Sequence, residues 1–130
     1  MIVLDTHVWI WWVDDHPRLN RAVRDRIDAE NDAESRAEGS ICPERRPLRF
    51  RAGKWPKPGQ WLEIAQTAQQ IRVERLTGAL CVESTTLPGE FHRDPADRLL
   101  VALARQLDAE LVTADSKILA YPHVRSFRAE

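Results

Sequence analysis

Two short apolar runs that each lead into an aspartate constrain the fold of this chain most. Residues 1–4 read Met-Ile-Val-Leu before Asp5, and residues 111–113 read Leu-Val-Thr shortly before Asp115. Both runs contain β-branched residues and lie beside a helical pattern, as buried strands of a parallel sheet do. In such sheets a carboxylate at the carboxyl end of a strand faces the crevice where ligands bind. Asp5 and Asp115 are therefore candidate site residues.

A third aspartate, Asp97, stands at the start of an expected helix. Pro95 suits the first helical turn, and Asp94 before it suits the N-cap position. Apolar residues then recur at helical spacing, at Leu99, Leu100, Leu103 and Leu107. The pattern therefore places Asp97 in the first turn of the helix, close to the rim of the sheet.

Strand-like and helix-like stretches alternate along the rest of the chain. We expect strands at residues 2–5, 71–76 and 110–113, a helix or turn at 8–12, helices at 17–30, 60–70, 78–87 and 96–107, and a short turn after residue 115. Strands that alternate with helices favour a parallel sheet covered by helices on both faces. The predicted fold class is α/β, a three-layer α/β/α domain with a central, mainly parallel sheet.

The composition supports one domain spanning residues 1–130. The chain is 43% hydrophobic and 30% charged, which is ordinary for a globular domain, and its length suits a single core. It has no apolar run of about 18 residues, so we expect no membrane span, no signal peptide and a cytoplasmic location. The net charge of −1 gives no general attraction to nucleic acid, so such contacts need a local basic patch.

Three carboxylates that converge on one point repel one another. Two unit charges ~4 Å apart cost about 4 kcal/mol at an effective dielectric constant of roughly 20, so such a cluster needs a cation. All the donors are oxygens, and the two cysteines have no zinc-like spacing, which favours Mg²⁺ or Mn²⁺. An ion held in this way lowers the pKa of a bound water and stabilises charge on a phosphoryl oxygen. The chemistry suggested is hydrolysis of a phosphodiester.

Each candidate also has a structural explanation. Taken alone, Asp5 and Asp115 are equally well explained as N-caps of the helices that follow them. No Ser or Cys nucleophile motif accompanies His7 or His92, so contact or structural roles are assigned to both. A phosphate hydrolase of the haloacid-dehalogenase type would place a second aspartate two residues after the first, where His7 stands instead. The three acids together, in this order, favour a shared acidic site.

Three stretches of the sequence carry a family pattern. They read Val-Leu-Asp-Thr-His-Val-Trp-Ile-Trp-Trp near the start, Leu-Pro-Gly-Glu-Phe-His-Arg-Asp-Pro-Ala-Asp-Arg-Leu-Leu-Val-Ala from residue 87, and Leu-Val-Thr-Ala-Asp-Ser-Lys-Ile-Leu from residue 111. In residue type and order they resemble a PIN-domain ribonuclease of the VapC toxin type, over roughly residues 1–30 and 59–124. The three motifs together are far more specific than any one of them.

The resemblance implies a PIN-like α/β/α fold and a metal-dependent endoribonuclease. Such a protein is the toxin of a VapBC-type toxin–antitoxin pair, so the implied partners are an RNA substrate, a small antitoxin and a second copy in a homodimer. Asp5, Asp97 and Asp115 match the metal-site acids, with Mg²⁺ or Mn²⁺ as the cofactor. Thr6 and Thr113 match the small hydroxyl residues beside those acids and would orient the carboxylates.

Three basic side chains near the acidic motifs are candidates for contact with RNA phosphates. They are Arg18, Arg98 and Lys117, the last of which lies just beyond Asp115. Contacts of this kind would supply the local attraction to RNA that the net charge of the chain does not.

Residues 33–58 depart from the family pattern. Family members have there a strand and then a helix that opens with Trp-Glu, whose glutamate joins the acidic cluster, and this chain has no Trp-Glu pair. Prolines interrupt every candidate helix and arginines replace the apolar face, so this part of the domain is atypical and its composition suits disorder. Glu44 is the acid placed roughly where the fourth ligand should fall.

We hypothesise that this segment arose by a local change of reading frame, because the family pattern resumes abruptly at residue 58. Translation of the coding DNA in the other frames tests the idea, which fails when no frame encodes a Trp-Glu helix. The alternative function is then a catalytically impaired PIN-domain remnant that only binds an antitoxin or dimerises. Metal-dependent cleavage of RNA distinguishes the two functions.

Overall fold

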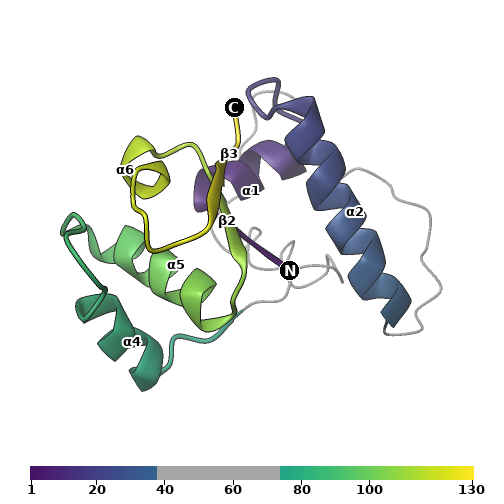
Figure 1. Cartoon of the computed structure of the whole chain (residues 1–130). Coiled ribbons are helices and arrows are strands. Elements are labelled where there is room, and N and C mark those ends of the chain that lie inside the picture. Colours follow the sequence, from purple (N-terminus) through teal and green to yellow (C-terminus); the bar gives the residue numbers. More distant parts are fainter. Residues whose placement is uncertain (38–73) are drawn as a thin grey trace, which may run out of the picture.

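The computed structural model describes residues 1–37 and 74–130, with the backbone alone over 31–37 (Figure 1). The elements are β1 (Ile2–Leu4), α1 (Thr6–Val13), α2 (Arg21–Ala37), α4 (Gly78–Thr85), α5 (Pro95–Gln106), β2 (Glu110–Thr113), α6 (Ser116–Leu119) and β3 (Ser126–Arg128). In the described parts of the chain, no helix is both long and apolar enough to cross a membrane.

The described strands form a parallel sheet in the order β1-β2-β3, with β2 in the middle. Val3 pairs with Leu111 across β1 and β2, and Val112 pairs with Phe127 across β2 and β3. The contact continues beyond the end of β1, because the Asp5 N–H donates to the Val112 carbonyl at 3.0 Å. The carboxyl ends of these strands therefore meet at one edge of the sheet, with Asp5 beside the end of β2.

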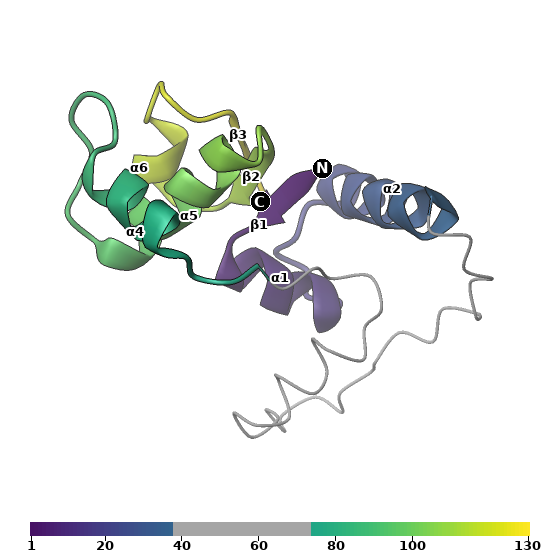
Figure 2. The same ribbon diagram turned by 90° about the horizontal axis from the view of Figure 1, so that it is seen from below.

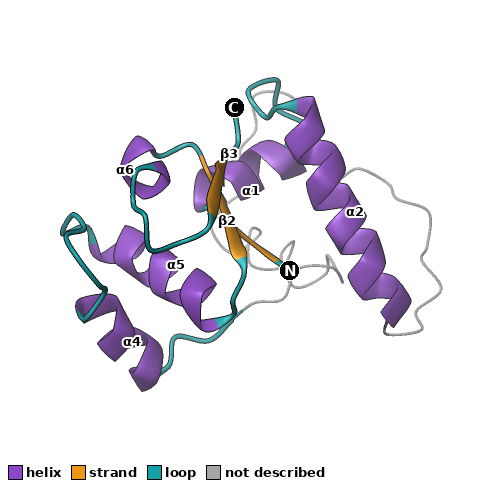
Figure 3. Ribbon diagram, in the orientation of Figure 1, coloured by secondary structure: helices purple, strands orange, loops and turns teal. Residues whose placement is uncertain are grey.

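Helices cover both faces of this sheet, with α4, α5 and α6 on one side and α1 and α2 on the other (Figures 1, 2 and 3). Side chains alternate between the faces along each strand. Val3 and Leu111 join the core beneath α4, α5 and α6, whereas Val112 joins the core beneath α1 and α2. The predicted three-layer α/β/α class is therefore confirmed.

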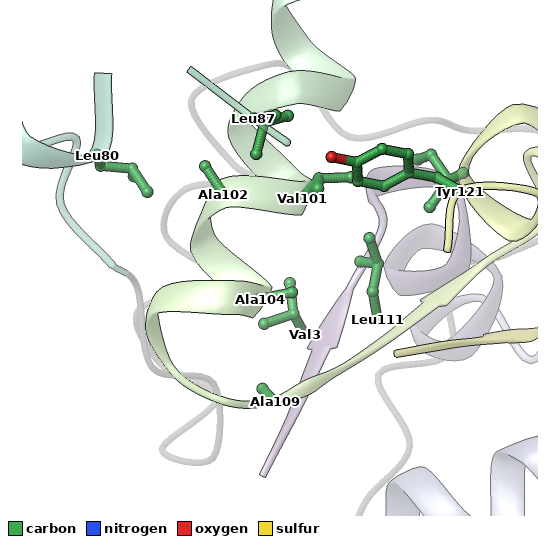
Figure 4. Close-up of a cluster of buried hydrophobic side chains, with 10 residues drawn as sticks. Val3, Leu80, Leu87, Val101, Ala102, Ala104, Ala109, Leu111 and Tyr121 are labelled. Carbon is green, nitrogen blue, oxygen red and sulfur yellow. The ribbon is translucent and has the colours of Figure 1, made fainter. Parts of the chain in front are cut away.

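The core on the α5 side holds the scaffold of the site. Figure 4 shows Val101 and Ala104 of α5 close to Val3 of β1 and Leu111 of β2, with Tyr121 beside them. Val101 and Leu111 are fully buried. Burial of side chains of this size stabilises a domain by about 1.5–3 kcal/mol each, so this packing fixes α5 against the sheet.

The start of α5 follows the sequence prediction closely. The Asp94 carboxylate accepts hydrogen bonds from the N–H groups of Ala96 at 2.9 Å and of Asp97 at 3.4 Å, and Pro95 begins the helix. This confirms Asp94 as the N-cap. The first turn of α5 therefore carries Asp97 at a position fixed by the cap.

Several predicted boundaries need correction. The helix expected at 17–30 begins at Arg21, because Asn20 caps it by accepting from the Ala22 N–H at 2.9 Å. That helix also continues to Ala37, into the segment expected to be atypical. The helix or turn expected at 8–12 and the helices expected at 78–87 and 96–107 are observed as helices Thr6–Val13, Gly78–Thr85 and Pro95–Gln106, and the strand at 110–113 is observed as expected.

Three further differences concern strands and the middle of the chain. Strand β3 was not predicted; it pairs along β2, and beyond it the Ala129 N–H donates to the Thr113 carbonyl at 2.9 Å. Of the strand expected at 71–76, residues 74–76 are not in a strand, and residues 71–73 lie outside the described residues. The helix expected at 60–70 also lies outside them, as does Glu44.

Candidate functional site

Asp5 follows β1 directly and is only 8% exposed. It occupies the N-cap position of α1, yet its carboxylate makes no side-chain cap bond to that helix. Instead Oδ2 of Asp5 accepts from Oγ1 of Thr113 at 2.6 Å. A bond this short between a hydroxyl and a carboxylate is typical of a charge-assisted hydrogen bond. The Asp5 side chain therefore does not cap the helix, and the structural explanation offered for it is wrong.

Thr113 is fully buried at the end of β2 and links two of the acids. A hydroxyl donates one proton and accepts others. The Thr113 hydroxyl donates to Asp5, and its oxygen accepts from the N–H of Asp115 at 3.0 Å. The parallel register makes this possible, because it places the residue after β1 beside the last residue of β2. One side chain therefore fixes the Asp5 carboxylate and the backbone of Asp115.

Asp115 begins α6 and is its N-cap. Its Oδ1 accepts from the N–H groups of Lys117 at 2.7 Å and Ile118 at 3.3 Å. The structural explanation of Asp115 as a cap is therefore correct for one carboxylate oxygen. Capping and site roles are compatible, because the cap bonds use Oδ1 and leave Oδ2 outside them.

Asp97 lies in the first turn of α5, with its side chain 21% exposed. Its Oδ2 is 3.1 Å from Nε2 of His92. Burial raises the pKa of Asp97, the Asp94 carboxylate raises it further, His92 opposes the change, and the carboxylates of Asp115 and Asp5 also raise it. The last two contributions show that Asp97 feels the charge of both other acids. The structure thus brings the three predicted acids to one edge of the sheet.

The donor set fits a hard divalent cation. All three side chains offer oxygen, and a cation would offset the repulsion from Asp115 and Asp5 that contributes to the raised pKa of Asp97. Among the described residues, no group of three or more acidic, histidine or cysteine side chains is arranged so that it could hold a metal ion by itself. Mg²⁺ usually keeps several waters and uses one or two carboxylates directly, so a looser group of acids suits it.

The other predicted site residues occupy different surroundings. Thr6 is exposed at the start of α1, and Lys117 is exposed on α6 next to the acidic edge. Arg18 is exposed, pairs with Glu130 at 2.9 Å and lies over the ring of Trp11 at 4.8 Å.

Arg98 is bound to the protein's own backbone. Its guanidinium donates to the carbonyls of Ser84 at 2.7 Å, Phe91 at 3.1 Å and His92 at 3.2 Å. These bonds tie the start of α5 to the end of α4 and to the loop between them. Arg98 therefore supports the loop that carries His92. The position of Arg98 in the sequence did not predict this role.

The sequence did not predict His92 as a residue of the site, because only a contact or structural role was expected for it. The available signal was its place in the His-Arg-Asp-Pro-Ala-Asp stretch, close to the acid that it meets. Spacing along a loop does not say which way a side chain turns, so the contact with Asp97 needed the structure.

Fold and site together define an α/β domain with an acidic centre at the carboxyl edge of a parallel sheet. The family model described as PIN domain matches residues 2–124, and the chain belongs to this family. The chain is also similar to "Ribonuclease VapC22" of Mycobacterium tuberculosis, with 29% identity over 95% of this chain and 94% of that protein. The resemblance to VapC-type PIN domains is thereby confirmed. No solved structure matches the chain.

Proposed function

We propose that the chain is a metal-dependent endoribonuclease that hydrolyses RNA phosphodiesters. The observation that carries this proposal is the gathering of Asp5, Asp97 and Asp115 at one edge of the sheet, where the charges of Asp5 and Asp115 contribute to the raised pKa of Asp97. Membership of the PIN-domain family and similarity to a protein named as a ribonuclease support the reaction class.

Asp5, Asp97 and Asp115 would hold Mg²⁺ or Mn²⁺. When bound, such an ion supplies positive charge that polarises a water for attack and offsets the charge developing on the phosphoryl oxygens. The described residues do the positioning. The Thr113 hydroxyl holds Oδ2 of Asp5, and the α6 backbone holds Oδ1 of Asp115. These bonds prepare the carboxylates before any ligand arrives, which is what an electrostatic centre requires.

RNA contact is assigned to exposed basic side chains near this edge. Lys117 is exposed in the first turn of α6, two residues after Asp115, and is the first candidate for a phosphate contact. Arg18 is exposed too, although Glu130 competes for its guanidinium. Arg98 would have to give up backbone bonds to reach RNA. We therefore rank Lys117 first, and Lys117→Gln should weaken RNA binding and reduce its salt dependence.

The biological setting proposed is that of a VapBC-type toxin in the cytoplasm, bound by a small antitoxin and paired as a homodimer. Similarity to VapC22 along nearly the whole of both chains supports it. Co-expression of this chain with the product of an adjacent small gene, followed by co-purification, tests the antitoxin part. The mass of the purified chain alone in solution tests the dimer.

Cleavage of a mixed tRNA and rRNA substrate tests the activity. The full chain is assayed with Mg²⁺, with Mn²⁺ and with EDTA, beside Asp5→Asn and beside Asp25→Asn, an acid-to-amide control at an exposed position on α2. We expect metal-dependent cuts that Asp5→Asn loses and Asp25→Asn keeps. Cuts that persist in EDTA, or in Asp5→Asn, would refute the assignment.

A second function, binding without cleavage, is favoured by the missing Trp-Glu pair in residues 33–58. In that case the chain is an impaired remnant that captures an antitoxin or dimerises. A folded wild-type chain that binds a partner but cuts no RNA with either metal would support this second function. Glu44 remains the proposed fourth acid, so in an active chain Glu44→Gln should reduce cleavage while Glu38→Gln should not.

A further inference from the structure

His92 lies in the loop before α5, and its side chain is turned toward the acidic centre. Nε2 of His92 is 3.1 Å from Oδ2 of Asp97, and both side chains are about four-fifths buried. Nε2 itself is buried from solvent and has no hydrogen-bond partner among the described residues, so its contact with Asp97 is close but not aligned as a hydrogen bond. A buried polar atom without a partner is costly, so Asp97 is the group that can satisfy it.

The other ring nitrogen of His92 indicates where the proton lies. Nδ1 faces the backbone N–H of Asp94 at 3.4 Å and accepts from it. In a neutral imidazole the nitrogen that accepts carries no hydrogen, so the proton is on the other nitrogen. Nε2 then carries the hydrogen, and it lies 3.1 Å from Oδ2 of Asp97.

Two sets of contacts hold the His92 ring in place. Arg98 donates to the carbonyls of Phe91 and His92 and so fixes the backbone of the loop. The Phe91 ring lies 4.4 Å from the His92 ring and 4.6 Å from the ring of Tyr121, whose hydroxyl donates to the Pro88 carbonyl. The imidazole is thus supported by the loop and by the core.

We propose that His92 is a positioning residue of the acidic centre: its Nε2–H holds Oδ2 of Asp97 and sets the orientation in which Asp97 meets a divalent cation. The inference rests on the proposed function. It also gives the three acids a common arrangement. Thr113 donates to one oxygen of Asp5, the α6 backbone donates to one oxygen of Asp115, and Nε2 of His92 lies beside one oxygen of Asp97.

Two substitutions separate the contacts that His92 makes. His92→Gln places an amide N–H donor near the position of Nε2, so it can still reach Asp97. His92→Asn is shorter; its carbonyl can accept from the Asp94 N–H in place of Nδ1, but the side chain cannot reach Asp97. His16→Asn is the matched control, because His16 Nδ1 accepts from the Arg18 N–H two residues on, at 3.2 Å, in the same local arrangement.

The measurement is titration of each full-length variant with Mn²⁺ by calorimetry, with thermal unfolding in EDTA as a second readout. We expect His92→Asn to weaken Mn²⁺ binding about ten-fold or more, the size of effect seen when a group supporting a metal ligand is lost. His92→Gln should restore part of that loss, and His16→Asn should bind as the wild type does. In EDTA, the unfolding temperatures of the three variants should not rank in the same order as their affinities for Mn²⁺.

Equal Mn²⁺ affinity in His92→Asn and wild type would overturn the proposal while leaving the ribonuclease assignment intact. A wild-type chain that neither binds Mn²⁺ nor cuts RNA would instead remove the proposed function, and this inference with it. Nitrogen-15 chemical shifts of the wild-type imidazole give a test that needs no variant. A proton on Nδ1 rather than on Nε2 would contradict the arrangement.

Discussion

Asp5 stands at the N-cap of α1, but its carboxylate bonds to Thr113 across the sheet instead of to the helix. This contact is informative because an aspartate at the N-cap position ordinarily stabilises its helix by accepting a hydrogen bond from a backbone N–H. A fully buried hydroxyl held between Asp5 and the N–H of Asp115 has little freedom to move. At the scale of single residues, the site is therefore organised around Thr113.

Replacement of Thr113 tests this role. Thr113→Val keeps the shape of the side chain but removes the hydroxyl, leaving Oδ2 of Asp5 and the N–H of Asp115 without their partner. We expect a loss of about 1–3 kcal/mol in the free energy of unfolding, the cost of leaving a buried polar group unsatisfied. Urea unfolding measures it, with Thr113→Ser as the control that keeps a hydroxyl. A Thr113→Val chain as stable as Thr113→Ser would contradict the bond.

The raised pKa of Asp97 makes a prediction about pH. Because its pKa is higher in the folded chain than the ordinary 3.8, the folded state binds more protons than the unfolded state between the two values. Stability that is fully present below pH 3.8 is therefore lost as pH rises through the folded pKa. At neutral pH and without metal, the charge on Asp97 reduces the stability of the fold.

Asp97→Asn removes that charge. We expect a modest rise in melting temperature at pH 7 in EDTA, no larger than the roughly 4 °C that 1 kcal/mol produces in a domain of this size. The gain should shrink as the pH falls through the folded pKa and disappear below 3.8, where Asp97 becomes protonated in both states. Scanning calorimetry of both chains across this range measures the difference. A lower melting temperature for Asp97→Asn at pH 7 would contradict the raised pKa of Asp97.

At the scale of elements, the start of α5 carries the site because its cap, its first proline and its first acid follow one another in the sequence. Asp94 caps the helix, and Asp97 then lies in the first turn, beside the sheet edge. Packing of Val101 and Ala104 against β1 and β2 keeps the helix there.

Loss of this cap should loosen the helix start. Asp94→Ala removes the acceptor for the Ala96 and Asp97 N–H groups and should cost about 0.5–2 kcal/mol. Asp94→Ser keeps an acceptor without the charge and should lose less. Chemical unfolding compares the two variants, and an Asp94→Ala chain as stable as Asp94→Ser would show that the cap contributes nothing.

Elements that depend on local patterns were predictable, and elements that depend on distant pairing were not. Strand β2 and helix α5 have strong local signals: a short apolar run in one, and a cap with helical periodicity in the other. Strand β3 is three residues long and reads Ser-Phe-Arg, with no alternation long enough to identify. Its existence is set by pairing with β2, which no local window contains.

At the scale of the whole molecule, the three acids were predictable because each follows a recognisable strand or starts a recognisable helix. Parallel strands then bring those positions to one edge without further information. The contacts of His92 and Arg98 were not predictable, because they depend on how one loop folds against α4, α5 and Tyr121. Glu44 and the metal identity remain predictions from the sequence and the family.

One measurement tests the central claim, that Asp5, Asp97 and Asp115 form one divalent-cation centre. Crystals of the full chain grown with Mn²⁺ are measured at a wavelength where manganese scatters anomalously. We expect an anomalous peak at the carboxyl edge of the sheet, within direct or water-mediated reach of the three acids, and its loss in Asp5→Asn. A manganese peak elsewhere in the structure, or no peak in a chain that cuts RNA with Mn²⁺, would show that the three acids do not form this centre.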